Sequence, residues 1–253
     1  MKRIILYTVL LLVSVSSMAA EATSLDRWEA GNKAYSAGDY NKAITEYKAI
    51  LDGGEYSLDL YYNLANAYFK ADSVGKAILY YHKALRMDPS QPDVLHNLAF
   101  AETRTKDKVA EVQEFFLSRY MRTIRNTMNC TSWSVLSLVS IGLLFVFVVL
   151  FFLASRIGVR KAGFYGALVA LILAIVTTSF AISSRNDMLQ HDEAIVMASA
   201  VSVKSSPDSS TTDLFLLHEG TKLNVVSEVE DWCEVSLADG KKGWIESKNI
   251  EKI

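Results

Sequence analysis

The sequence is poor in cysteine, proline and charge. It contains two cysteines and three prolines among 253 residues, and charged residues make up 21%, against about 25% in an average soluble domain. Two cysteines are too few for a disulfide framework or a cysteine-rich metal site. The histidines have no metal-ligand spacing; they are His82, His96, His191 and His218. We therefore expect no metal and no cofactor.

The sequence also lacks the features of a nucleic-acid binder and of an enzyme. Its net charge is −2, whereas nucleic-acid-binding domains are usually basic. It has no glycine-rich phosphate loop and no nucleophile elbow. Cys130 lies at a predicted membrane boundary and Cys233 in a predicted strand, so we expect both thiols to be inert, and their pairing stays open. We predict a non-enzymatic protein that binds no nucleic acid.

Apolar residues make up 51% of the chain and gather in three blocks. In the first, Lys2 and Arg3 precede an uncharged stretch that ends in small residues. This pattern predicts a signal peptide over 1–20, with an uncleaved anchor as the alternative. The other blocks, 131–155 and 162–184, each reach the roughly 20 apolar residues that cross a bilayer as a helix. We predict two membrane-spanning helices.

Charge and the signal peptide together predict the membrane topology. The loop 156–161 carries three positive charges, which favours the cytoplasm. Arg119, Arg122 and Arg125 place three more before the first span, so charge alone does not decide. The signal peptide places residues before the first span outside, and two spans return the chain to that side. We expect both soluble segments to face the same extracytoplasmic compartment.

The first soluble segment repeats itself. A shift of 34 residues places Ala43 on Ala77, Tyr47 on Tyr81 and Asn63 on Asn97. Self-similarity at this period is typical of stacked helix pairs. The segment 24–105 resembles the tetratricopeptide repeat, with units at 24–57 and 58–91 and a partial unit at 92–105. The resemblance implies an α-helical solenoid.

In tetratricopeptide repeats the first helix of each pair lines a concave binding face. The resemblance therefore implies a partner-binding face on these helices, although Trp28 and Tyr62 suit internal packing equally well. The carboxylate clamp of some family members is absent, because Trp28 and Asp93 occupy two of its positions. The candidate binding residues are Trp28, Asn32, Tyr35, Tyr62, Asn63, Asn66, Phe69, Lys70, His96, Asn97 and Phe100.

An amphipathic segment connects the repeats to the first span. Val109, Val112, Phe116, Tyr120 and Ile124 recur every three or four residues, as on one face of a helix. We predict a juxtamembrane helix within 106–128 that lies on the outer membrane interface. The alternative is a connecting helix packed on the repeats.

The last segment, 194–253, has strand periodicity. Short alternating runs occur at 201–204, 222–226 and 232–237, and Asp239-Gly240 is a hairpin turn signal. The segment resembles the bacterial SH3 domain in the order and spacing of its residue types, which implies an all-β, SH3-like barrel. Trp232 and Trp244 are candidate peptide-binding aromatics, and packing is the alternative for each.

Together, the segments predict a multi-domain membrane protein. The order of its segments resembles that of the Bacteroides-aerotolerance protein E (BatE) family. This resemblance implies a protein of the bacterial inner membrane, with both soluble domains in the periplasm and a role in oxygen tolerance or stress response. From the residues we predict a scaffold that binds other proteins, which would be components of a membrane complex. The alternative function is binding of peptidoglycan peptide by the SH3-like domain.

Overall fold

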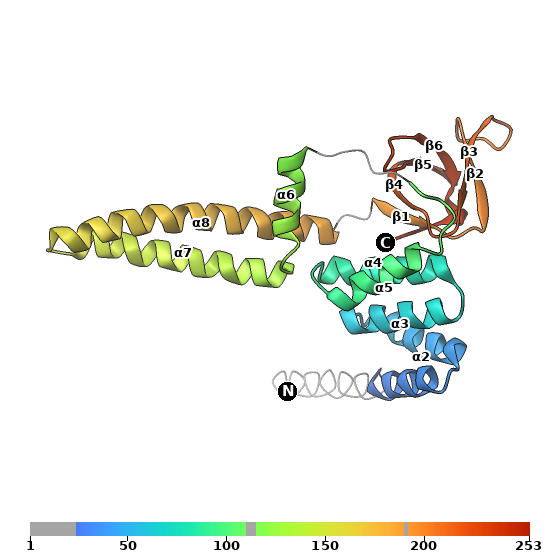
Figure 1. The fold of residues 1–253 in the computed structure, drawn as a ribbon, viewed down its shortest axis with the longest axis horizontal. Helices are drawn as coiled ribbons and strands as arrows, with labels where there is room; N and C mark the ends of the chain where they lie inside the picture. The colour runs from blue at the N-terminus through green and yellow to red at the C-terminus, as the bar shows by residue number, and fades with distance from the viewer. Residues whose placement is uncertain (1–23, 110–114, 190–191) are drawn as a thin grey trace, which may run out of the picture.

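The fold is described from a computed structural model for residues 24–109, 115–189 and 192–253 (Figure 1). The predicted signal peptide, Val112 and His191 lie outside the described residues. We call residues 24–105 the helical domain and residues 193–253 the β-domain. A long pair of helices, which we call the hairpin, extends away from both domains (Figure 1).

The helical domain consists of a helix over 24–36 followed by α2 (Tyr40–Asp52), α3 (Leu58–Lys70), α4 (Val74–Met87) and α5 (Pro92–Glu102). The side chains of Asp39 and Ser57 accept hydrogen bonds from backbone N–H groups in the first turns of α2 and α3, as helix caps do. Gly38 and Asp72 occupy the same turn in successive repeats and have φ angles of 81° and 62°. Aspartate tolerates this left-handed conformation, so the repeat keeps its turn without the glycine.

Equivalent residues of the two repeats form the core of the helical domain. Ala43 and Ala77 are fully buried, and the rings of Tyr47 and Tyr81 are 1% exposed. The small side chains let the paired helices approach, and the tyrosine rings fill the space between pairs. The helix pairing expected from the 34-residue period is therefore present.

The β-domain is a single seven-stranded antiparallel sheet. Its order is β3-β2-β6-β5-β4-β1-β7, so β3 and β7 are the two edges. The sheet is thus open in its hydrogen bonding, where the sequence predicted a barrel. The elements are β1 (Glu193–Val196), β2 (Ala200–Lys204), β3 (Asp213–His218), β4 (Lys222–Val229), β5 (Trp232–Ser236), β6 (Lys242–Glu246), the 3-10 turn η1 (Ser247–Asn249) and β7 (Ile250–Lys252).

The two domains pack against each other through α4. Ile195 on β1 and Ile253 after β7 belong to the buried core of the helical domain. At the first turn of α4, the backbone N–H of Gly75 donates to Glu219 Oε1 over 2.7 Å, while the N-cap residue Ser73 makes no side-chain capping bond. The β-domain thus supplies a cap that α4 lacks. The predicted binding residues on the first helices are not buried.

Asp107 fastens the segment after α5 to the β-domain. Its carboxylate accepts hydrogen bonds from the backbone N–H of His218 and from Thr221 Oγ1, both over 2.7 Å, and lies 2.8 Å from His218 Nδ1. Burial raises the pKa of Asp107, but these hydrogen bonds outweigh it and hold the pKa below its usual value. The carboxylate therefore stays ionised and bonded to both residues.

The imidazole of His82, on the helix α4 that packs against the β-domain, is neutral. Burial, assisted by the positive charges of Lys222 and Arg86, lowers its pKa to about 3. Within the described chain its buried Nε2 has no hydrogen-bond partner. The positive charges of both domains meet at this point, which disfavours a further proton on the imidazole.

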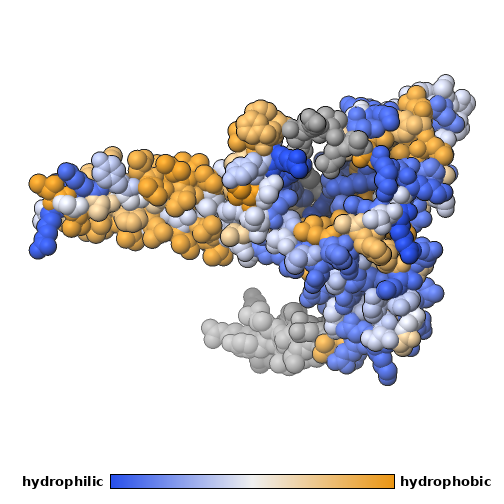
Figure 2. Space-filling model, viewed as in Figure 1, coloured by the Kyte–Doolittle hydropathy of each residue, from blue (hydrophilic) through white to orange (hydrophobic). Residues whose placement is uncertain are grey.

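The hairpin consists of α7 (Cys130–Leu153) and α8 (Ile157–Leu189). The helix α8 begins within the predicted loop 156–161 and continues beyond the predicted end at 184. The most apolar 18-residue windows of α7 and α8 have mean hydropathies of 3.0 and 2.2, and most of their surface is uncovered. Figure 2 shows this apolar surface along the hairpin. A core helix of a soluble domain would be covered, so both helices are compatible with a membrane anchor.

The amphipathic segment before α7 forms a helix only over Phe116–Arg125, which is α6. Val109, which the sequence places on the apolar face of a longer helix, packs against the core of the β-domain instead. None of the residues of α6 is buried, so packing of this helix on the repeats is not observed.

Candidate functional site

The first helices of the repeats present a stripe of the predicted binding residues. Trp28, Asn32 and Tyr35 lie on the helix over 24–36, five more residues lie on α3, and His96, Asn97 and Phe100 lie on α5. We call this set the first-helix stripe. Its residues on α3 are Tyr62, Asn63, Asn66, Phe69 and Lys70.

The asparagines of the stripe connect successive helices. Asn63 Nδ2 donates to Asn32 Oδ1 over 3.3 Å, and Asn97 Nδ2 donates to Asn66 Oδ1 over 2.9 Å. The hydroxyl of Tyr47 also donates to Asn32 Oδ1, over 2.7 Å. Burial raises the pKa of Tyr47 to about 12, so this hydroxyl remains a donor. The predicted binding asparagines therefore also hold the array together.

The second tyrosine of the core repeats this arrangement. Tyr81 donates to Asn66 Oδ1 over 2.6 Å, and burial raises its pKa. Each of the two carbonyls, on Asn32 and Asn66, thus accepts two hydrogen bonds from its own domain. The amide N–H groups of these two side chains make no hydrogen bond within the described part of the chain, which leaves them as donors for a ligand backbone.

The aromatic residues of the stripe divide into packing and exposed groups. Trp28 packs against Tyr47 with ring centroids 5.7 Å apart, and Tyr62 packs against Tyr81 at 6.3 Å. Phe100, in contrast, is 56% exposed, and its ring lies 5.5 Å from that of Phe69. The exposed apolar contact of the stripe is therefore at its α5 end.

This end of the stripe also carries charge. The guanidinium of Arg104 lies 5.1 Å from the ring centroid of Phe69 and forms an ion pair with Asp72 over 3.0 Å. Lys70 is exposed on the same helix as Phe69. The α5 end thus combines apolar rings with cations, an arrangement that suits a peptide with apolar and acidic side chains.

The β-domain has a separate groove with a volume of about 570 Å³. Three segments that are distant in sequence line it: the loop between β2 and β3, the turn between β4 and β5, and η1 with the end of β6. The lining residues are Pro207, Asp208, Ser209, Asp231, Trp232, Glu246, Ser247 and Lys248. We call this the β-domain groove.

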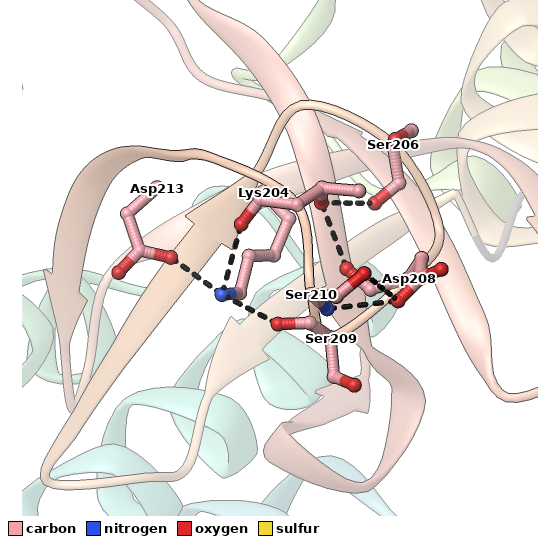
Figure 3. A network of polar contacts seen from close by, with 7 residues as sticks. Lys204, Ser206, Asp208, Ser209, Ser210 and Asp213 are labelled. Carbon is pink, nitrogen blue, oxygen red and sulfur yellow. Dashed lines mark hydrogen bonds and ion pairs between the residues drawn. The ribbon is translucent and has the colours of Figure 1, made fainter.

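A network of polar contacts holds the loop that forms one wall of the groove (Figure 3). Lys204 Nζ donates to the main-chain oxygens of Ser209 and Thr211 over 3.0 and 3.3 Å and pairs with Asp213 over 2.7 Å. Asp208 accepts from the backbone N–H and the hydroxyl of Ser210, which lowers its pKa. The loop is therefore fixed and presents an ionised carboxylate.

The groove is acidic and contains one large aromatic ring. Asp208, Asp231 and Glu246 face one lysine, Lys248, which already pairs with Glu246 over 2.5 Å. Carboxylates beside a tryptophan suit a cationic ligand. No periodic signal could have revealed this groove, because its carboxylates come from three segments that are separate in the sequence.

The two candidate tryptophans are placed differently. Trp232 lines the groove, whereas Trp244 lies on β6 opposite Glu234 and Lys204 and does not belong to the lining. Both cysteines are free thiols, Cys233 being buried and Cys130 partly exposed. The described segments contain no cluster of three metal-ligating side chains.

Comparison with known families identifies two modules. The bacterial SH3 domain family matches residues 199–251, which include β2 to β6, the first two residues of β7 and every residue that lines the groove. The tetratricopeptide repeat family matches residues 58–91, which are α3, α4 and the turn after them. These matches confirm the SH3-like domain and the tetratricopeptide unit predicted at 58–91. No curated protein matches the chain.

Proposed function

We propose that the chain is a non-enzymatic, membrane-anchored scaffold that binds other proteins outside the cytoplasm. The tetratricopeptide match supports protein partners, and the bacterial SH3 match supports an extracytoplasmic location. The observation that carries the proposal is the free first-helix stripe. Because the β-domain docks on α4, the second helix of its pair, the stripe remains open to a partner.

We place both domains in the periplasm and the hairpin in the bacterial inner membrane. The docking of the two domains supports a common side, since Gly75 precedes the hairpin in sequence and Glu219 follows it, yet the two residues are hydrogen-bonded. The sequence signals at residues 1–20 and in the loop 156–161 support the outward orientation.

Reporter fusions test this topology. An alkaline phosphatase reporter inserted at Lys106 or fused after Ile253 should be active, because both sites would face the periplasm. A green fluorescent protein fused at the same two sites should be dark and serves as the complementary control. Cytoplasmic signal from either site would contradict the proposed orientation.

Replacing Phe100 with alanine should release a partner from the stripe. The side chain is 56% exposed, so its loss should barely affect folding, but losing an aromatic contact at an interface costs about 1–2 kcal/mol or about tenfold in affinity. Co-purification of the full chain from membranes measures the recovery of partners. This variant is sharper than alanine at the asparagines, which would also remove bonds within the array.

Leu95→Ala is the matched control for Phe100→Ala. Leu95 lies on the same helix, α5, and is 46% exposed, but it lies outside the stripe. It should leave partner recovery unchanged. Equal partner recovery with both variants would contradict the assignment of the α5 end of the stripe as a binding surface.

The resemblance to the BatE family supports a role of this scaffold in oxygen tolerance or stress response. If the role acts through bound proteins, a strain without the gene should grow poorly after exposure to oxygen. The wild-type gene should restore growth and the Phe100→Ala gene should not. Full restoration by Phe100→Ala would separate oxygen tolerance from the stripe.

A second candidate function is binding of peptidoglycan peptide by the β-domain groove. The SH3 match and the acidic groove around Trp232 favour it, because wall peptides carry free amino groups. Trp232→Ala should weaken binding of the full chain to purified peptidoglycan by about 2 kcal/mol, or about thirtyfold. Trp244→Ala, on the next strand but outside the groove, is the control and should bind normally. If Trp232→Ala pellets with peptidoglycan as well as the wild type does, the groove is not the peptidoglycan-binding site.

A further inference from the structure

The helix α6 has an apolar face that no other element covers. None of its residues is buried, and Phe116, Leu117, Tyr120 and Met121 are 41 to 73% exposed. Phe115, just before the helix, is 65% exposed. Large exposed patches of this kind mark a protein or membrane contact.

The residues of α6 separate cleanly around the helix axis. At about 100° per residue, the apolar side chains fall within an arc of about 140°. They are Phe116, Leu117, Tyr120, Met121 and Ile124. Ser118, Arg119, Arg122, Thr123 and Arg125 occupy the rest of the circumference. Such an arrangement is typical of a helix that lies flat in a membrane interface.

The position of α6 fits this interface. Figure 1 shows α6 crossing the end of the hairpin that is nearer to the soluble domains, instead of extending the hairpin. Arg125 fixes this crossing, because it pairs with Asp187 over 2.7 Å and donates to Ser183 Oγ over 2.8 Å. Trp133 Nε1 donates to the main-chain oxygen of Arg125 over 2.8 Å. A hairpin that spans the bilayer would therefore hold α6 along the membrane surface.

The arginines of α6 are not equivalent. Arg125 forms an ion pair with Asp187. Arg122 lines a cavity together with Asp107 and with Lys222 of the β-domain. Arg119 is exposed on the polar side, and no ion pair joins it to any part of the chain that the structure describes. Its guanidinium is the one placed to meet a phosphate.

We propose that α6 is a membrane-surface helix, with its apolar face among lipid acyl chains and Arg119 bound to the phosphate of an anionic lipid. This inference rests on the proposed anchoring of the hairpin. It adds a second attachment, at the surface of the bilayer, between the helical domain and the first span. The two soluble domains are thereby held close to the headgroups and not on a free tether.

Lipid quenching of an attached fluorophore tests the proposal on the full chain. An environment-sensitive dye is attached to a cysteine at Phe116→Cys, in a Cys130→Ala background in which Cys233 stays buried. The protein is reconstituted in vesicles of phosphatidylcholine with or without phosphatidylglycerol, and nitroxide lipids serve as quenchers. We expect strong quenching at position 116 and its loss at Ser118→Cys, the matched site on the polar face.

A second variant tests the arginine. Arg119→Gln should abolish the extra quenching at position 116 that phosphatidylglycerol produces, and it should leave quenching in phosphatidylcholine unchanged. Persistence of the phosphatidylglycerol effect in Arg119→Gln would overturn the assignment of the phosphate contact.

A dye at Leu138→Cys on α7 separates this inference from the proposed anchoring. Leu138 is 70% exposed on the hairpin, so it should be quenched whenever the hairpin is inserted. Quenching at 138 but not at 116 would overturn the surface helix and leave the anchor intact. A blue-shifted but unquenched dye at 116 would indicate that a protein, such as a second copy, covers this face, and would equally overturn the lipid contact. No quenching at 138 would overturn both.

Discussion

Replacing Gly243 with valine should strongly destabilise the β-domain. A Cβ atom at this buried position would lie 2.5 Å from Val203 Cγ1 and 2.8 Å from the main-chain oxygen of Lys204. The second contact involves backbone, so no side-chain rotation relieves it. Lys204 and Trp244 form the only residue pair that joins β2 to β6 in the described sheet, so the clash separates β2 and β3 from the other strands.

We expect the valine to cost about 3 kcal/mol, the upper part of the range for overpacking. For a domain of this size the loss corresponds to about 12–24 °C in the unfolding midpoint. Tryptophan fluorescence of the full chain in detergent follows this transition. Lys242→Val, at the exposed neighbouring position of the same strand, is the control and should move the midpoint little. A midpoint for Gly243→Val within a few degrees of wild type would contradict the close approach of β2.

Replacing Ile195 with alanine should destabilise both soluble domains together. Ile195 is fully buried and lies on β1, but its side chain belongs to the core of the helical domain. Truncating a buried isoleucine to alanine costs about 2–5 kcal/mol. Because the lost contacts cross between the domains, the helical domain should lose stability although the substitution is in the β-domain.

Two signals measured in one urea titration test this coupling. Circular dichroism reports mainly the helices and tryptophan fluorescence reports both domains, and both midpoints should fall in parallel. Leu216→Ala on β3, where the side chain is 51% exposed, is the control and should change neither. A fall in the fluorescence midpoint alone would show that the domains unfold independently.

The sequence predicted the repeats well because their signal is local and repeated. The 34-residue period placed Tyr47 and Tyr81 in equivalent core positions, and both are buried as expected. The role of the asparagines within the array was not visible, because Asn32 and Asn63 meet across 31 residues of chain. Only the stacking of the helices shows that their side chains bond to each other.

The strand β1 was missed for a physical reason. Ala194 and Val196 face the core of the β-domain, while Ile195 faces the core of the helical domain. Both faces of the strand are therefore buried, and the alternation that signals a half-exposed strand is absent. The start of α8 was missed because Arg160 and Lys161 indicated a loop, although charged residues continue a helix without difficulty at the end of a span.

The docking of the β-domain on α4 also determines when, during synthesis, the interface between the two domains can form. Gly75 and its capping carboxylate on Glu219 are separated by 144 residues, and the whole hairpin lies between them. At a synthesis rate of about 5–20 residues per second, Glu219 is synthesised about 7–30 s after Gly75. Until then α4 lacks both its cap and its contact with Ile195. During this interval the helical domain has left the ribosome with an apolar surface uncovered. The time for which this face stays uncovered is therefore set by the length of the hairpin and not by the folding rate of the repeats.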